Sequence, residues 1–140
     1  MAYDENNIFA KILRGELPAH TVYEDADVIA FLDIMPQAPG HTLVVPRAAS
    51  RNLLDAAPET LARLLPAVQR LAHAVKTAFD ADGVTVMQFN EAAGGQTVYH
   101  LHVHVIPRMD GVALAKHTGG MEKGEVLAAH AARIKAALAG

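Results

Sequence analysis

The segment from His100 to Ile106 alternates without a break between histidine and aliphatic side chains, reading His-Leu-His-Val-His-Val-Ile. Successive side chains of a β-strand point to opposite faces, so this spacing predicts a strand over residues 99–106. The three histidines would share one face of that strand, and the aliphatic residues between them would share the other. The aliphatic face has to be buried, which requires a sheet covered on that side by other elements.

Hydrophobic periodicity along the rest of the chain predicts further short strands and three helices. The expected helices cover residues 8–13, a long segment from about 55–58 to 79, and a segment after Gly119-Gly120; the expected strands cover 21–23, 28–31, 42–45 and 84–89. These elements do not alternate as regular βαβ units. Their order therefore favours an α+β fold on an antiparallel sheet of about five strands over a doubly wound parallel sheet.

The long central helix has the most continuous apolar pattern. Its predicted buried stripe consists of Leu61, Leu64, Leu65, Val68, Leu71, Ala72, Val75 and Phe79. Pro66 interrupts this segment, and an interior proline costs roughly 3 kcal/mol, so we expect a kink or a shorter helix. The last helix would bury one face, formed by Leu127, Ala131, Ile134 and Leu138.

The composition indicates the class of protein and excludes several functions. A chain of 140 residues, 51% of them hydrophobic, is long enough for one packed domain. It has no apolar run for a membrane-spanning helix and no signal-peptide pattern at its start, so we expect a cytoplasmic protein. The absence of cysteine excludes disulfides and thiolate metal sites. A net charge of −3 predicts no nucleic-acid binding, although backbone donors can still bind a small anion.

The row of three histidines has three interpretations. In the first, it is the polar face of a strand in contact with water. In the second, it binds a metal, but His100 and His104 would lie roughly 13 Å apart on an extended strand, so one ion could take only two of the three rings. In the third, it is catalytic, because imidazoles titrate near neutral pH and can donate, accept or attack. Three histidines at three outward positions favour catalysis.

A glycine-bearing loop, residues 90–97, leads into the histidine strand. Gly94 and Gly95 permit tight turns whose successive backbone N–H groups can surround an anion. Thr97 adds a hydroxyl group and Gln96 an amide. A phosphate beside this loop would face the middle histidine, and the combination of loop and strand is a far stronger signal than the loop alone.

These segments together resemble the histidine triad family, whose defining motif is His-φ-His-φ-His-φ-φ with φ an apolar residue. Residues 100–106 match that motif fully. Four further segments resemble the family's Gly-His-x-Leu-Val-x-Pro segment, its nucleoside-contacting strand and loop, its opening helix and the stretch before the triad; they are residues 40–46, 31–39, 8–12 and 90–100. The resemblance covers about residues 5–108, leaves a divergent tail over 109–140, and is closest to the Hint branch.

The resemblance implies a fold and an activity. Hint-branch proteins are α+β homodimers in which the antiparallel sheets of two subunits join across the two-fold axis. They cleave at the α-phosphate of nucleotides that carry an amine or similar leaving group, and they favour purine nucleoside phosphoramidates. This chemistry requires no divalent metal or other cofactor, because the histidines and the loop amides stabilise the charge.

The resemblance also implies roles for individual residues. His102 would be the nucleophile, with one ring nitrogen held by a backbone carbonyl, and would form a nucleotidyl-histidine that water hydrolyses. His104 would donate to the phosphoryl oxygens and the leaving group, while His100 and His41 would orient the row. Asp33 would accept the ribose hydroxyls. Phosphate contacts would come from Asn90, Gly95, Gln96 and Thr97, and base contacts from Ile8, Phe9, Ile12, Phe31 and Ile34.

Several of these residues have plainer alternatives. Ile12 and Phe31 would equally fit an ordinary core, and His41 would fit a structural role. We expect surface or cap positions for His20, His73, His117 and His130, of which His117, in the divergent tail, is the first to check. Asn7, Ala10 and Ala49 stand where many bacterial relatives carry zinc ligands, so we expect no structural zinc.

The sequence leaves other functions open. A second enzymatic hypothesis is hydrolysis of dinucleoside polyphosphates, as in the Fhit-like branch. A third hypothesis is a nucleotide-binding regulatory module without catalysis, although such a module would not need His102. A metal-binding protein is a weaker alternative.

Overall fold

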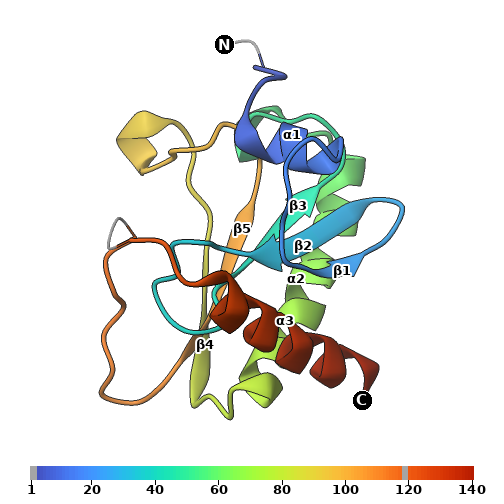
Figure 1. The fold of residues 1–140 in the computed structure, drawn as a ribbon. Helices are drawn as coiled ribbons and strands as arrows, with labels where there is room; N and C mark the ends of the chain where they lie inside the picture. The colour runs from blue at the N-terminus through green and yellow to red at the C-terminus, as the bar shows by residue number, and fades with distance from the viewer. Residues whose placement is uncertain (1–2, 118–119) are drawn as a thin grey trace.

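The computed structural model describes residues 3–117 and 120–140, and a five-stranded antiparallel sheet lies at its centre (Figure 1). The strands are β1 (Thr21–Glu24), β2 (Val28–Leu32), β3 (Thr42–Pro46), β4 (Gly83–Met87) and β5 (Val103–Arg108), in the spatial order β1-β2-β3-β5-β4. The helices are α1 (Ile8–Leu13), α2 (Pro58–Ala78) and α3 (Gly124–Ala139), with 3₁₀ turns η1 (Leu53–Asp55) and η2 (Ala92–Gly94). The predicted α+β class, antiparallel sheet and long helix are confirmed; Gly119, a predicted helix-start signal, lies outside the described residues.

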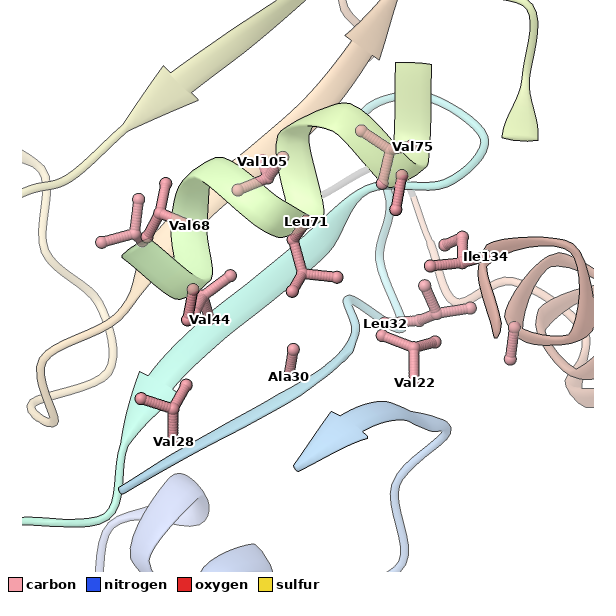
Figure 2. Packing of buried hydrophobic residues seen from close by; sticks show 14 of the residues in the cluster. Val22, Val28, Ala30, Leu32, Val44, Val68, Leu71, Val75, Val105 and Ile134 are labelled. Carbon is pink, nitrogen blue, oxygen red and sulfur yellow. The ribbon is translucent and has the colours of Figure 1, made fainter. Parts of the chain in front are cut away.

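One face of the sheet packs against α2 and α3 and forms the larger hydrophobic core (Figure 2). Alternate residues of β2 and β3 enter it, among them Ala30 and Val44, which are fully buried beneath Leu71 and Val75 of α2. Ile134 of α3 closes the same core. Fully burying one such aliphatic side chain contributes about 1.5–3 kcal/mol, so this layer fixes the position of the sheet.

The opposite face of the sheet packs against α1 and forms a smaller cluster. Phe9 of α1 lies there with Phe31 of β2 and Leu43 of β3, whose neighbours in the same strands point to the larger core. Asn7 caps α1, because its side-chain oxygen accepts a hydrogen bond from the backbone N–H of Ala10 at 2.8 Å. Both faces are therefore covered, and the smaller cluster forms the floor of the site described below.

Strand β5 begins at Val103, so the predicted strand over residues 99–106 is too long at its start. His100 and His102 precede the strand, and their neighbourhood is held by other hydrogen bonds: the backbone N–H of Leu101 donates to the carbonyl of Ser50 at 2.8 Å. The alternation of faces persists nevertheless. Leu101, Val103 and Val105 all lie in the core beneath α2, as predicted.

Helix α2 differs from the predicted helix in two respects. It is not shortened by Pro66, which lies on the exposed side of the helix together with Ala62. Water can therefore reach the carbonyl of Ala62, which lacks the usual hydrogen bond from residue 66. Leu65, predicted to belong to the buried stripe, is 68% exposed. Among the described helices, none is long and apolar enough to cross a membrane.

Candidate active site

A cavity of about 310 Å³ lies on the α1 face of the sheet, within the usual size range of small-molecule sites. Most of the residues predicted to bind a nucleotide line it. They are Ile8, Phe9, Ile12, Phe31, Asp33, Ile34, Thr97, His102 and His104. His41 and His100 lie behind this lining as fully buried side chains, and Asn90, Gly95 and Gln96 belong to the adjoining loop. Phosphate contacts from these three loop residues stay a prediction.

The three histidines of the row are buried, so the interpretation of a polar face in water is wrong. The exposed fractions of His100, His102 and His104 are 0%, 7% and 6%. Burial penalises the charged imidazolium and lowers the pKa of all three, that of His104 to about 3. Each ring is therefore neutral at pH 7 and carries a single proton, and its hydrogen-bond partners determine which nitrogen holds it.

The proton of His102 is on Nδ1. This nitrogen lies 2.6 Å from the carbonyl oxygen of His100, which can only accept a hydrogen bond. Nε2 consequently keeps its lone pair, and His102 lines the cavity. The ring of Phe9 packs against it in a T-shaped arrangement, with the two centroids 4.8 Å apart. The geometry thus presents a neutral, oriented imidazole with one free lone pair, which is what a nucleophile requires.

A hydrogen-bond relay from the backbone fixes the proton of His104. The N–H of Gln37 donates to Nδ1 of His41 at 3.1 Å, so the proton of His41 is on Nε2. That N–H donates in turn to Nδ1 of His104 at 2.9 Å. Burial, reinforced by neighbouring His104, lowers the pKa of His41 to about 3, so the relay is uncharged at pH 7. The remaining nitrogen of His104, Nε2, carries a proton that it can donate in the cavity.

His100 supports the row from behind, together with a residue that the sequence did not single out. Its Nε2–H donates to the carbonyl of Pro46 at 2.8 Å, which leaves Nδ1 to accept from the hydroxyl group of Tyr3 at 2.5 Å. Both nitrogens are therefore occupied, and His100 is not available for chemistry. Its backbone carbonyl, which orients His102, is held in place by these bonds.

Asp33, the predicted ribose acceptor, lies at the end of β2 with both carboxylate oxygens bonded. Oδ1 accepts from the backbone N–H of Met35 at 2.9 Å, and Oδ2 accepts from Nε2 of His117 at 2.8 Å. His117 also lines the cavity. The expected surface or cap position of His117 is therefore wrong: the tail brings it into the site, and no local sequence pattern indicated this contact.

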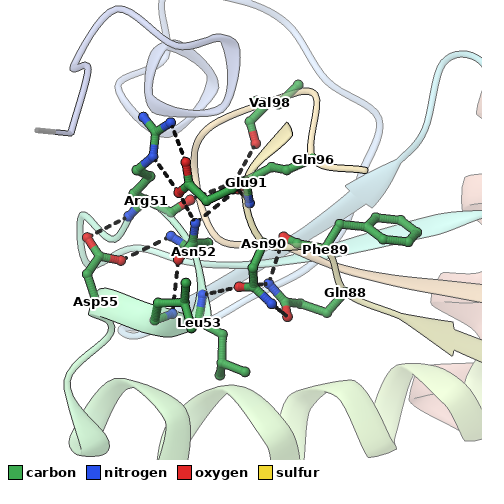
Figure 3. Close-up of polar contacts among 11 residues, drawn as sticks. Arg51, Asn52, Leu53, Asp55, Gln88, Phe89, Asn90, Glu91, Gln96 and Val98 are labelled. Atoms are coloured by element: carbon green, nitrogen blue, oxygen red, sulfur yellow. Dashed lines mark hydrogen bonds and ion pairs between the residues drawn. The ribbon is translucent and has the colours of Figure 1, made fainter. Parts of the chain in front are cut away.

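The loop before the histidine row is fastened by a polar network (Figure 3). Glu91 has backbone angles of φ 64° and ψ 163°, a conformation found almost only in glycine. Its carboxylate is held by two bonds from Arg51, at 2.7 and 2.9 Å, and one from Asn52 at 2.6 Å. Such charge-assisted bonds offset the cost of this backbone, about 1–3 kcal/mol.

Gln96 completes the network from the other end of the loop. Its side-chain oxygen accepts from the N–H of Glu91 and from Asn52, and its amide nitrogen donates to the carbonyls of Arg51 and Val98. The side chain is 3% exposed and fully used within the protein. Gly95, at φ 100°, makes the turn in between. Gln96 thus shapes the loop beside the cavity, and the open position there belongs to Thr97.

One group of described side chains has the spacing of a metal site. Asp33, His41 and His104 each offer one ligand atom, and these atoms lie within 4.8 Å of one another. The hydrogen bond from Gln37 to Nδ1 places the proton of His41 on Nε2, the nitrogen that an ion would need. Binding a metal would break this bond and the relay to His104. The residues present therefore suit a hydrogen-bond relay better than a metal.

Comparisons with known proteins agree with this geometry. A family model, the HIT domain, matches residues 14–111. The protein named "Protein hit" of Bacillus subtilis is 40% identical over 104 residues, 74% of this chain and 72% of that protein. A crystallised Hit-like protein involved in cell-cycle regulation from Bartonella henselae is 62% identical, with a TM-score of 0.92 over 97% of this chain and 99% of that one. A hypothetical histidine triad nucleotide-binding protein from Sulfolobus tokodaii is 31% identical, with a TM-score of 0.87 over 94% and 91%. The chain therefore belongs to the histidine triad (HIT) family of nucleotide-binding hydrolases and transferases.

Proposed function

We propose that this protein hydrolyses purine nucleoside phosphoramidates, or related nucleotide conjugates, through a covalent nucleotidyl-histidine on His102. The observation that carries the proposal is the bond from Nδ1 of His102 to the carbonyl of His100, which leaves the lone pair of Nε2 free beside the cavity. In the first step this lone pair forms a bond to the α-phosphorus, and the bond from phosphorus to the leaving nitrogen breaks. A water molecule in the cavity gives a proton to the leaving amine, while His104 keeps its N–H and stabilises the phosphoryl oxygens. In the second step the hydroxide that this water leaves attacks the phosphorus, the bond from phosphorus to Nε2 of His102 breaks, and the nucleoside monophosphate is released.

The electrostatics of the cavity fit this mechanism. Among the described residues that line it, none is lysine or arginine. The phosphoryl oxygens would be stabilised by the N–H of His104 and by donors of the loop that ends at Thr97. Because these rings stay neutral at pH 7, the N–H groups of His41 and His104 are fixed hydrogen-bond donors, and Nε2 of His102 keeps its lone pair.

The remainder of the cavity fits a nucleoside. Ile8, Phe9, Ile12 and Phe31 offer an apolar surface for a base, and Ile8, at 53% exposed, lies at its rim. The carboxylate of Asp33 can accept the two ribose hydroxyls with the lone pairs that Met35 and His117 leave free.

The decisive test is a single-turnover reaction with an adenosine phosphoramidate, quenched and analysed by intact mass and peptide mapping. We expect a transient adenylate adduct on His102, followed by release of adenosine monophosphate. The His102→Ala variant should form no adduct but should still bind adenosine monophosphate. Nucleotide binding without adduct or product in the native protein would instead indicate a regulatory module. Turnover of a dinucleoside polyphosphate alone would indicate the Fhit-like activity.

We further propose that the protein acts as a homodimer. Strand β4 is an edge of the sheet, and Val86 on it is 50% exposed. Beside this edge, Leu53 and Leu65 line an apolar hollow between η1 and α2 and are 45% and 68% exposed. Apolar surface next to an open sheet edge supports association of two copies. Sedimentation analysis should give a dimer for the native protein and a monomer for Leu65→Glu; a native monomer would contradict the proposal.

A further inference from the structure

The tail after β5 lies across the loop that follows β2 (Figure 1). We call the part of it formed by residues 109–117 and 120–122 the strap. The N–H of Ala115 donates to the carbonyl of Gln37 at 2.8 Å, and the side chain of Gln37 donates back to the carbonyl of Ala115 at 3.2 Å. Beyond His117, the N–H of Glu122 donates to the carbonyl of Ile34 at 2.8 Å. His117 is thus anchored on both sides to the loop that also holds Asp33 and His41.

His117 determines which hydrogen bonds the Asp33 carboxylate can make. Oδ2 of Asp33 accepts from His117, and it also lies 3.6 Å from Nε2 of His41, just beyond hydrogen-bond distance. The side chain of Asp33 is only 7% exposed, so an oxygen deprived of its partner would find little water. The nearest donor for it would be the N–H of His41.

A carboxylate competes strongly for that N–H, because a charged acceptor binds a donor more tightly than a neutral imidazole does. If His41 turned to Asp33, Nδ1 of His104 would lose the bond that places its proton on Nε2. The donor facing the cavity would then no longer be fixed. The carboxylate would also rotate away from the orientation that its two present partners impose.

We propose that His117 is a positioning residue of the active site, which holds Asp33 for the ribose and thereby keeps the N–H of His41 on His104. The inference rests on the proposed nucleotide chemistry and deepens it. It adds to the site a residue of the tail, 84 positions away from Asp33 in sequence. His117 acts through other residues and does not need to touch the reacting phosphorus.

The first test is kinetic and uses an adenosine phosphoramidate and its 2′,3′-dideoxy analogue. For His117→Ala we expect KM for the ribonucleotide to rise about tenfold, with KM for the dideoxy analogue nearly unchanged, because only the diol uses Asp33. We also expect kcat to fall about tenfold for both substrates, because His104 loses its fixed proton. His117→Gln, which keeps an N–H donor of similar reach, should restore most of both losses. Lys116→Ala, at an exposed neighbouring position of the strap, is the matched control and should behave as the native protein.

The second test does not depend on turnover. Imidazole ¹⁵N spectra report which ring nitrogen is protonated, and in the native protein they should show the proton of His104 on Nε2. In His117→Ala this signal should become averaged between the two nitrogens, while Lys116→Ala leaves it unchanged. Native kinetics and a native His104 signal in His117→Ala would overturn the inference and leave the proposed function standing. A native protein without any nucleotide turnover would overturn the function, and the spectra would still decide the role of His117.

Discussion

Two polar clusters lie in or beside the cavity, and they differ in how many of their polar atoms are free to bond a ligand. In the cluster of Arg51, Asn52, Glu91 and Gln96, every side chain is bonded to another part of the protein. In the histidine row, His102 and His104 each keep one ring nitrogen without a hydrogen-bond partner among the described residues. The first cluster, which we call the closed cluster, can only stabilise the fold. The histidine row, which we call the open cluster, can also react with a ligand. Substitutions in the two clusters should therefore separate activity from stability.

The largest expected effect is on activity in the open cluster. His102→Ala removes the nucleophile and should lower the rate of product formation by about four orders of magnitude or more, as loss of a nucleophile does in other covalent enzymes. The free energy of unfolding should change by only about 1 kcal/mol, because one hydrogen bond to the carbonyl of His100 is lost. Turnover and urea denaturation on the same preparation measure both. A large loss of stability would mean that this row is structural as well, and would remove the contrast.

The closed cluster should show the opposite behaviour. Gln96→Ala leaves the N–H of Glu91 and the carbonyls of Arg51 and Val98 without their side-chain partner, in a buried place. We expect the free energy of unfolding to fall by about 2–3 kcal/mol. The activity of the folded fraction should fall less than tenfold, since Gln96 does not line the cavity. A loss of activity comparable to that of His102→Ala would show that Gln96 contacts the phosphate after all.

The last expected effect, absent at neutral pH and growing only as the pH falls, is a pH dependence of stability that comes from His104 and His41. The pKa of His41 and that of His104 are lowered from an ordinary 6.5 to about 3, so the unfolded chain binds protons there before the folded one does. The stabilisation is complete above pH 6.5 and is lost as the pH falls toward 3. The slope should approach about 1.4 kcal/mol per pH unit for each ring.

Urea denaturation between pH 7.5 and 5 would measure this dependence. His73→Gln, a change on the exposed side of α2, is a suitable control and should leave the slope unchanged. A native protein whose stability is flat over this range would mean that the row accepts protons without unfolding. The open cluster would then tolerate charge, contrary to its burial.

The sequence predicted the sheet well because its signals are local. The alternation over residues 100–106 and most of the stripe of α2 follow from the periodicity of strands and helices, and Leu101, Val103 and Val105 bury the side that was expected. Leu65 was misassigned because α2 has more apolar residues than its buried face holds, so that an apolar residue there can still be exposed. The start of β5 was misplaced because a carbonyl bond to the side chain of His102 replaces strand pairing there.

The site was predictable only as far as its motif extends. His102 and His104 lie in the cavity as the motif implies, and Asp33 lies beside them. The contacts of Tyr3 with His100 and of His117 with Asp33 join residues 97 and 84 positions apart. No periodicity or spacing encodes such pairs, because the folding of the whole chain brings them together. The proton positions likewise depend on backbone groups such as the N–H of Gln37, which every sequence contains.

The orientation of His102 depends on a backbone carbonyl, and this has a consequence for engineering. Side-chain partners can be exchanged by mutation, but a peptide carbonyl is common to every amino acid, so no substitution at position 100 deletes it. The nucleophile can therefore be disoriented only by moving the main chain. Redesign of this cavity for other leaving groups can vary the rim, and the tail apart from His117, while the attacking nitrogen keeps its orientation.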